Sequence, residues 1–145
     1  MYAQPVMNTR NPLNAYAKVA IDNTVETANP HKLILMLFDG AMLAVANGRA
    51  QMERGEIAEK GQSISKAINI ITNGLKASLD QERGADLAER LAALYDYMEL
   101  RLVHANLRND PAVLQEVHGL LGELRSAWAE IANDPAVLSA NASGV

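Results

Sequence analysis

The chain has 145 residues, 49% of them hydrophobic but only 4% aromatic, and a formal net charge of −4. This length fits one domain that can bury a core. Cysteine is absent, which excludes disulfides, thiolate chemistry and Cys-ligated metals. The 13 basic residues are scattered, so nucleic acid is not an expected partner. With no run of about 18 apolar residues and no signal-peptide pattern, we expect a cytoplasmic protein without membrane insertion.

The first predicted element is a short helix behind a flexible arm. Residues 1–12 contain two prolines with Asn and Gln and are expected to form that arm. Beyond it, Leu13, Tyr16, Ala20 and Ile21 recur at helical spacing and make one narrow apolar stripe. A helix this short is marginal by itself, so we expect it to pack on the rest of the protein.

Four long helices are predicted next. Asn-Pro and Asp-Pro pairs, a glycine and a polar turn place them at residues 30–54, 56–79, 85–108 and 111–132. The connections are a few residues long, which favours antiparallel neighbours. The predicted fold is all-α, an antiparallel up-down-up-down four-helix bundle with the short N-terminal helix packed across it. Residues 13–132 form this single domain, and residues 133–145 a disordered tail.

Some of these helices are apolar over more than one face. A four-helix bundle has one interior, so the additional apolar side chains need another cover. The cover could be the N-terminal helix, a second copy of the chain in a homodimer, or an amphipathic helix of another protein. The side chains that we select as candidates for partner binding, together with two from the N-terminal helix, are Leu13, Tyr16, Phe38, Met42, Ala67, Ile70, Tyr95 and Leu107.

No catalytic, cofactor or metal site is predicted. The glutamates and histidines lack the Glu-x-x-His spacing of di-iron bundles, and His31, His104 and His118 are expected in solvated or capping roles. A histidine phosphotransfer domain is also a four-helix bundle, but its histidine needs a nearby glycine, and Leu33 and its neighbours follow His31. We also expect Trp128 to be largely buried.

An unusual polar segment lies inside the third long helix. Leu-Tyr-Asp-Tyr-Met at residues 94–98 is followed by Ala-Asn-Leu-Arg-Asn-Asp at residues 105–110. The two tyrosines must point to different faces, and Asp96 is expected to accept a hydrogen bond from another helix or a tyrosine hydroxyl.

These two segments resemble the flagellin-specific export chaperones of the FliS family. The segments at residues 29–40 and 66–80 resemble the second and third helices of that family. The resemblance covers roughly residues 13–132, and it implies a cytoplasmic chaperone that is not an enzyme. Such a chaperone binds the disordered C-terminal segment of flagellin, prevents premature filament polymerisation and delivers the subunit to the flagellar type III export apparatus. It also implies contact between the region of Tyr16 and an export gate protein, and it allows an anti-sigma factor as a partner.

Overall fold

The computed structural model describes residues 29–79 and 84–131, and these residues contain helices and no strand. The helical elements are α2 (Pro30–Glu53), α3 (Ile57–Asn69), a π-helix η1 (Ile70–Leu75), a 3-10 helix η2 (Lys76–Ser78), α4 (Ala85–Arg108) and α5 (Pro111–Ile131). The all-α prediction is therefore confirmed for this part of the chain. The predicted short helix, the arm and the tail lie outside it.

Local signals set the ends of α2. The side chain of Asn29 accepts a hydrogen bond from the backbone N–H of Lys32 at 2.8 Å, and Pro30 occupies the first helical position. After Glu53 the chain turns through Gly55, whose φ of 75° favours glycine. Among the described helices, α2 is long and apolar enough to cross a membrane, a property that core helices of soluble proteins share.

The helix predicted at residues 56–79 is not uniform. The α-helical part ends at Asn69, and the chain continues through the π turns of η1 and the short 3-10 helix η2. Apolar residues here recur every four residues, at Ala67, Ile71, Leu75 and Leu79. In a regular α-helix each step of four residues rotates the side chain by about 40°, because 3.6 residues complete a turn. The wider turn of a π-helix absorbs this rotation and keeps the four residues near one face.

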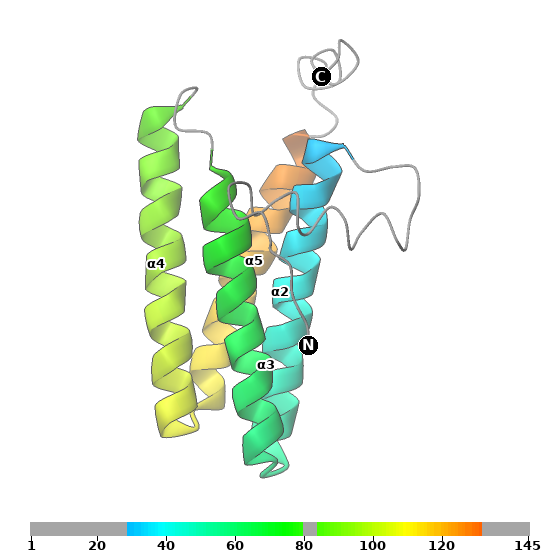
Figure 1. Cartoon of the computed structure of the whole chain (residues 1–145), viewed down its shortest axis with the longest axis vertical. Helices are drawn as coiled ribbons and strands as arrows, with labels where there is room; N and C mark the ends of the chain where they lie inside the picture. Colours follow the sequence, from blue (N-terminus) through cyan, green and yellow to red (C-terminus); the bar gives the residue numbers. More distant parts are fainter. Residues whose placement is uncertain (1–28, 80–83, 132–145) are drawn as a thin grey trace, which may run out of the picture.

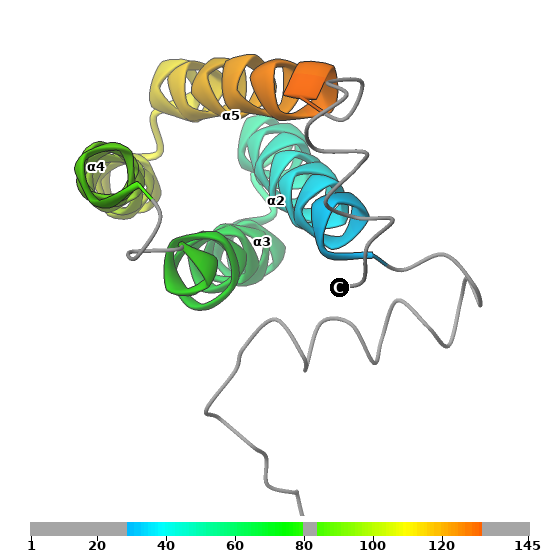
Figure 2. The same cartoon turned by 90° about the horizontal axis from the view of Figure 1, so that it is seen from above.

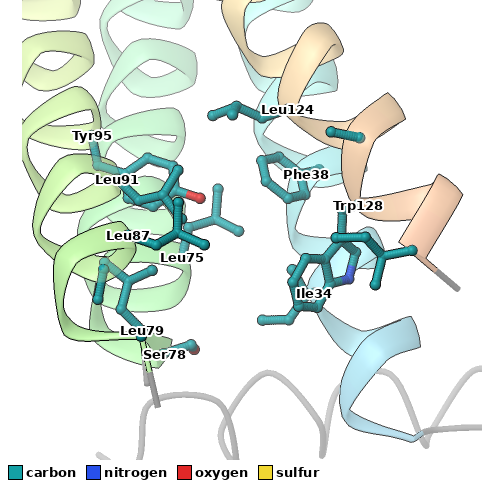
Figure 3. A pocket seen from close by; sticks show the side chains of 14 residues that line it. Ile34, Phe38, Leu75, Ser78, Leu79, Leu87, Leu91, Tyr95, Leu124 and Trp128 are labelled. Atoms are coloured by element: carbon teal, nitrogen blue, oxygen red, sulfur yellow. The ribbon is translucent and has the colours of Figure 1, made fainter. Parts of the chain in front are cut away.

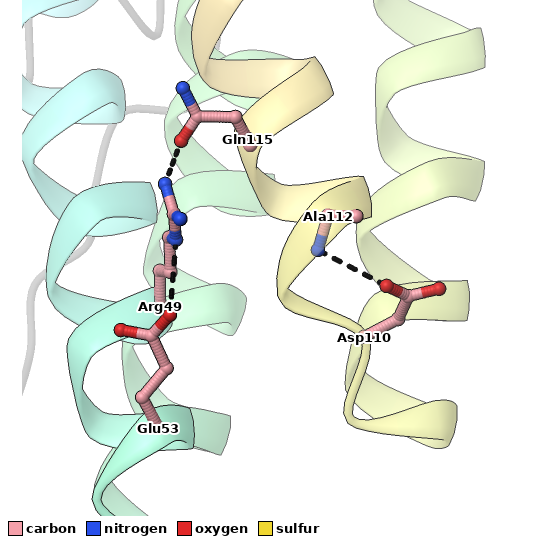
Figure 4. A network of polar contacts seen from close by, with 5 residues as sticks. All are labelled: Arg49, Glu53, Asp110, Ala112 and Gln115. Atoms are coloured by element: carbon pink, nitrogen blue, oxygen red, sulfur yellow. Dashed lines mark hydrogen bonds and ion pairs between the residues drawn. The ribbon is translucent and has the colours of Figure 1, made fainter.

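The junction between α4 and α5 is held by polar groups on both sides. Asn109 ends α4 in the left-handed conformation, with a φ of 52°. The carboxylate of Asp110 then accepts from the backbone N–H of Ala112 at 3.1 Å at the start of α5 (Figure 4). On the other side of α5, Gln115 accepts from Arg49, which also pairs with Glu53 (Figure 4).

The four long elements surround one core. Figure 1 shows the chain direction reversing from each long element to the next. Helix α2 packs on both α3 and α5, and α4 packs on α3 and α5 from the other side (Figure 2). Viewed from above, α4 and α5 meet at residues 108–111 and diverge toward the opposite end of the molecule (Figure 2). The largest fully buried side chains are Ile64, Ile71, Met98, Leu102, Leu114 and Leu121.

Candidate functional site

An apolar pocket lies at the end of the molecule where α4 and α5 diverge (Figure 3). Its volume is about 480 Å³, within the usual range for ligand pockets. Helices α2 and α5 form one wall, and α4 with the end of the third helix forms the other (Figure 3). None of the lining residues carries a charge. They are Ile34, Phe38, Leu75, Ser78, Leu79, Gly84, Leu87, Ala88, Leu91, Tyr95, Leu124, Ala127, Trp128 and Ile131.

Tyr95 occupies the inner part of the α4 wall. Its side chain is buried, and burial raises the pKa of the phenol to about 12. Tyr97 points to the outside of the same helix, where its hydroxyl donates to Glu116 on α5. Arg101 donates to the same carboxylate at 2.8 Å, and the two hydrogen bonds lower the pKa of Glu116. The two tyrosines thus face different sides, as predicted, and Tyr95 is the one that reaches the pocket.

Trp128 and His31 form a stacked pair beside the pocket. The ring centroids are 4.5 Å apart with an angle of 10° between the planes, and the indole N–H donates to the carbonyl of His31 at 2.9 Å. Trp128 packs against the core and is partly buried, in line with the expected burial of this residue, and one side of its indole borders the open pocket. His31 is 8% exposed, and its Nε2 is buried with no partner among the described residues. The expected solvated or capping role of His31 is therefore wrong.

The buried position of His31 bears on the phosphotransfer alternative. A phosphate-accepting histidine must be reachable by its phosphodonor, whereas this imidazole is covered by the indole of Trp128. His104 is exposed on α4 and His118 is half-buried on α5. In the described part of the chain no group of three or more His, Asp or Glu residues could hold a metal ion.

The segment formed by η1, η2 and Leu79 supplies part of the same pocket wall as α4 (Figure 3). Leu75, Ser78 and Leu79 come directly after or at the end of the π turn and all line the cavity. The hydroxyl of Ser78 donates to the carbonyl of Gly74 at 2.6 Å, so the polar group of this residue is satisfied within the helix. The pocket therefore offers its contents apolar contacts from this side.

The structure separates the side chains that the sequence placed together as partner-binding candidates. Phe38 and Tyr95 line the pocket. Ala67 and Ile70 do not line it and belong to the core, and Met42 is half-buried against α5, with its methyl group 3.5 Å from where a side chain on Gly122 would begin. Leu13 and Tyr16 lie outside the described residues.

The predicted position of Phe38, Ala67, Ile70 and Tyr95 outside the core is wrong, since all four are at most 6% exposed. The reason is that α2 packs on two helices, which covers both of its apolar faces, while the π turn buries Ile70 beside Ile71. Contact of these residues with a partner stays a prediction.

Leu107 lies apart from the other candidates. It is 76% exposed and does not line the pocket, which takes its α4 residues from the other end of the helix. Asp96, which was expected to accept a hydrogen bond from another helix, accepts from the ammonium group of Lys76 at 2.6 Å.

Sequence reasoning missed most of the residues that form the pocket. Leu87 and Leu91 on α4, and Leu124 and Trp128 on α5, recur at helical spacing. Their spacing indicates an inward face but not that the two helices diverge and leave the inward face open. The available signal was the small share of aromatic residues, 4%, in a chain with long apolar helices, which makes complete filling of the interior harder.

The described residues combine an all-helical fold with an open, uncharged apolar pocket, which suits a ligand with an apolar surface. Comparison with known proteins identifies the family: residues 12–135 match the family model of the flagellar protein FliS. The chain is 52% identical over 118 residues to the flagellar secretion chaperone FliS of Salmonella typhimurium, covering 81% of this chain and 87% of that protein.

Other relatives agree. Identity is 47% over 126 residues to the flagellar secretion chaperone FliSB of Pseudomonas aeruginosa, covering 87% of this chain and 94% of that protein. It is 38% over 136 residues to FliS of Vibrio cholerae, covering 94% and 99%. The chain belongs to the FliS family of flagellar secretion chaperones, a family of chaperones and not of enzymes.

Proposed function

We propose that this protein binds the disordered C-terminal segment of flagellin in the cytoplasm and holds it in the apolar pocket between α2, α4 and α5. The bound segment cannot join a filament prematurely, and the chaperone delivers the subunit to the flagellar type III export apparatus. The observation that carries the proposal is the pocket itself, which is large, open and lined by no charged residue.

The chemistry of the pocket suits one face of an amphipathic helix. Such a helix presents apolar side chains at positions i, i+3, i+4 and i+7. These side chains need a pocket wall without polar groups that would lose hydrogen bonds to water on binding. Tyr95 and Phe38 supply aromatic surface inside, and Leu87 and Ile131 supply exposed apolar surface at the rim. A disordered segment loses conformational entropy when it folds on binding, so the apolar contact area must compensate for that loss.

We further propose that the short N-terminal helix covers this pocket in the free protein. Helix α2 begins at the pocket end of the molecule, since Ile34 in its second turn lines the cavity. The apolar stripe that contains Leu13 and Tyr16 ends at Ile21, eight positions before Asn29, so the connecting chain limits its distance from the pocket. Flagellin would displace it, and the released segment would be available to an export gate protein. An anti-sigma factor would be a further partner of the same surface.

The test uses two exposed leucines with the same accessibility. Leu87 lines the pocket and Leu43 on α2 does not, and both are 62% exposed. We expect Leu87→Asp to weaken binding of a flagellin C-terminal peptide at least about tenfold, since a carboxylate would lose water on contact with the apolar ligand. Leu43→Asp is the matched control and should bind normally. Isothermal titration calorimetry measures both affinities.

Trp128 provides a second readout, because it is the single tryptophan of the chain and lines the pocket. A peptide without tryptophan should shift its emission to shorter wavelength as water leaves the indole. Equal affinities of the two aspartate variants, or no change in emission on binding, would contradict the pocket as the flagellin site.

A further inference from the structure

The chain contains one six-residue sequence twice. Asn-Asp-Pro-Ala-Val-Leu stands at residues 109–114 and again at residues 133–138. The first copy lies within the described residues, where it joins α4 to α5, and the second begins two positions after Ile131, the last residue of α5. The first copy therefore shows which local structure this sequence favours.

The first copy ends one helix and begins the next. Asn109 closes α4 in the left-handed conformation, and the side chain of Asp110 accepts a hydrogen bond from the backbone N–H of Ala112. Pro111 is the first residue of α5. These end and start signals act through side chains within a few residues. The same three residue types stand at residues 133–135, so we expect the chain to reverse there and to begin another helical turn.

In the first copy, the start of the helix carries two aliphatic side chains into the core. Val113 is 5% and Leu114 is 0% exposed. The equivalent residues of the second copy are Val137 and Leu138. A short helix is unstable on its own, so these two side chains need an apolar surface to pack on. The composition of the tail favours disorder, and the repeated sequence makes its first residues the exception.

The apolar pocket is the surface within reach of the second copy. Ala127, Trp128 and Ile131, at the end of α5, all line this pocket (Figure 3). Leu138 is seven positions after Ile131. Seven residues span at most about 23 Å when fully extended. The pocket lining carries no charge, and residues 135–145 contain no charged side chain either, so contact between them buries no charge.

We propose that residues 134–138 form a helical turn that packs Val137 and Leu138 on the pocket in the free protein, and that flagellin displaces this turn. The competition with flagellin rests on the function proposed above, whereas the packing of the tail does not. Two aliphatic side chains make a weak contact that a longer ligand can displace, and they leave room for the N-terminal helix. The tail thereby lowers the apparent affinity of the pocket for flagellin, because only the uncovered fraction of the protein can bind.

Because the chain contains no cysteine, two introduced cysteines can report the packing. Leu138→Cys with Leu87→Cys, the pocket pair, places one thiol in the tail and the other at the rim of the pocket. Leu138→Cys with Leu43→Cys is the remote pair, since Leu43 is as exposed as Leu87, at 62%, but does not line the pocket. In dilute protein we expect the intramolecular disulfide of the pocket pair to form at least about tenfold faster, as measured by mass spectrometry.

A further substitution separates packing from tethering. Val137→Asp, added to the pocket pair, should slow disulfide formation at least about fivefold, because a carboxylate would lose water in an apolar pocket. Ser139→Asp, added instead, is the control, since it introduces the same charge at the position equivalent to the exposed Gln115. Equal rates for the pocket and remote pairs, or no slowing by Val137→Asp, would overturn the packing of the tail.

Isothermal titration calorimetry with a flagellin C-terminal peptide tests the competition. Val137→Asp with Leu138→Asp should tighten binding about threefold to tenfold, because the pocket is then uncovered more often. Ser139→Asp with Ser143→Asp adds the same charge and should leave the affinity unchanged. Unchanged or weaker binding by the first variant would overturn the competition.

The two experiments distinguish this inference from the proposed function. If the unaltered protein fails to bind the peptide while the pocket pair still reacts faster than the remote pair, the proposed function and the competition fail, and the packing of the tail stands. If the peptide binds and the two pairs react equally fast, the tail does not cover the pocket and the proposed function stands.

Discussion

The ammonium group of Lys60 lies 2.7 Å from Oδ1 of Asn109, and the same group donates to the carbonyl of Asn106 at 3.0 Å. Lys60 is 3% exposed, so this cation is held inside the molecule by the end of another helix. The C-terminus of a helix carries unpaired carbonyls and a partial negative charge. A lysine ammonium group donates hydrogen bonds to these carbonyls and is attracted by the negative charge. The contact fastens α4 to α3 at the end of the bundle away from the pocket.

Replacing Lys60 by methionine keeps the apolar stem and removes the ammonium group. We expect the free energy of unfolding to fall by about 1–3 kcal/mol, because two part-buried hydrogen bonds from a charged donor are lost. Urea denaturation measures this difference. Lys66→Met on the same helix is the control, since Lys66 is exposed. If both variants are equally stable, the contact does not contribute to stability.

Ile70→Asp should destabilise the protein instead of acting on flagellin binding alone. Ile70 is 6% exposed within the core, so the new carboxylate would be buried without a partner. The expected cost is about 3 kcal/mol or more. Thermal denaturation followed by circular dichroism measures it, and Asn73→Asp, at an exposed position of the same π turn, should have little effect. A stable Ile70→Asp protein would contradict the placement of Ile70.

The raised pKa of Tyr95 makes stability depend on pH in the alkaline range. In the unfolded chain a tyrosine ionises near pH 10, whereas burial raises the pKa of Tyr95 in the folded protein to about 12. Above pH 10 the unfolded state therefore binds fewer protons, and stability falls as pH rises toward 12. The loss from this group approaches about 2–3 kcal/mol at pH 12.

Urea denaturation of the wild type and Tyr95→Phe at pH 8, 10 and 11.5 isolates this contribution. The phenylalanine variant should lose less stability between pH 10 and 11.5 than the wild type does. Parallel curves for the two proteins would mean that Tyr95 ionises normally in the folded state.

The N-terminal helix that we propose as a cover of the pocket can be tested by hydrogen exchange. Amides of residues 13–21 should exchange through opening that costs much less free energy than global unfolding, and addition of a flagellin C-terminal peptide should change their protection. Amides in α3 serve as the internal reference. Exchange at residues 13–21 that equals the reference and ignores the peptide would refute a displaceable cover.

The ends of the helices could be predicted from the sequence because they depend on local signals. Asn29 before Pro30, and Asn109 with Asp110 before Pro111, determine caps from side chains within a few residues. Burial was harder to predict. Whether Phe38 lies in the core or outside it depends on α2 having neighbours on both sides, which no local pattern specifies.

The pocket could not be predicted for a related reason. It exists because α4 and α5 diverge from their junction, and the sequence of each helix gives its apolar face but not the angle between them (Figure 2). The π turn did leave a signal in the sequence. Three successive intervals of four between Ala67 and Leu79 do not fit an α-helix, and this mismatch could have indicated the wider turn.

Because of the π turn, the helical segment at residues 57–79 contains one residue more than an α-helix would need to place the same side chains on the pocket wall. Asn73 is exposed, and removing it would shorten the interval from Ile71 to Leu75 from four residues to three. The interval of four residues from Leu75 to Leu79 would not change. An unbroken α-helix accommodates that spacing, so Leu75 and Leu79 would still face inward. The length of this helix is therefore tolerant to the loss of one residue at a single place, and relatives one residue shorter there could keep the same pocket with a simpler backbone.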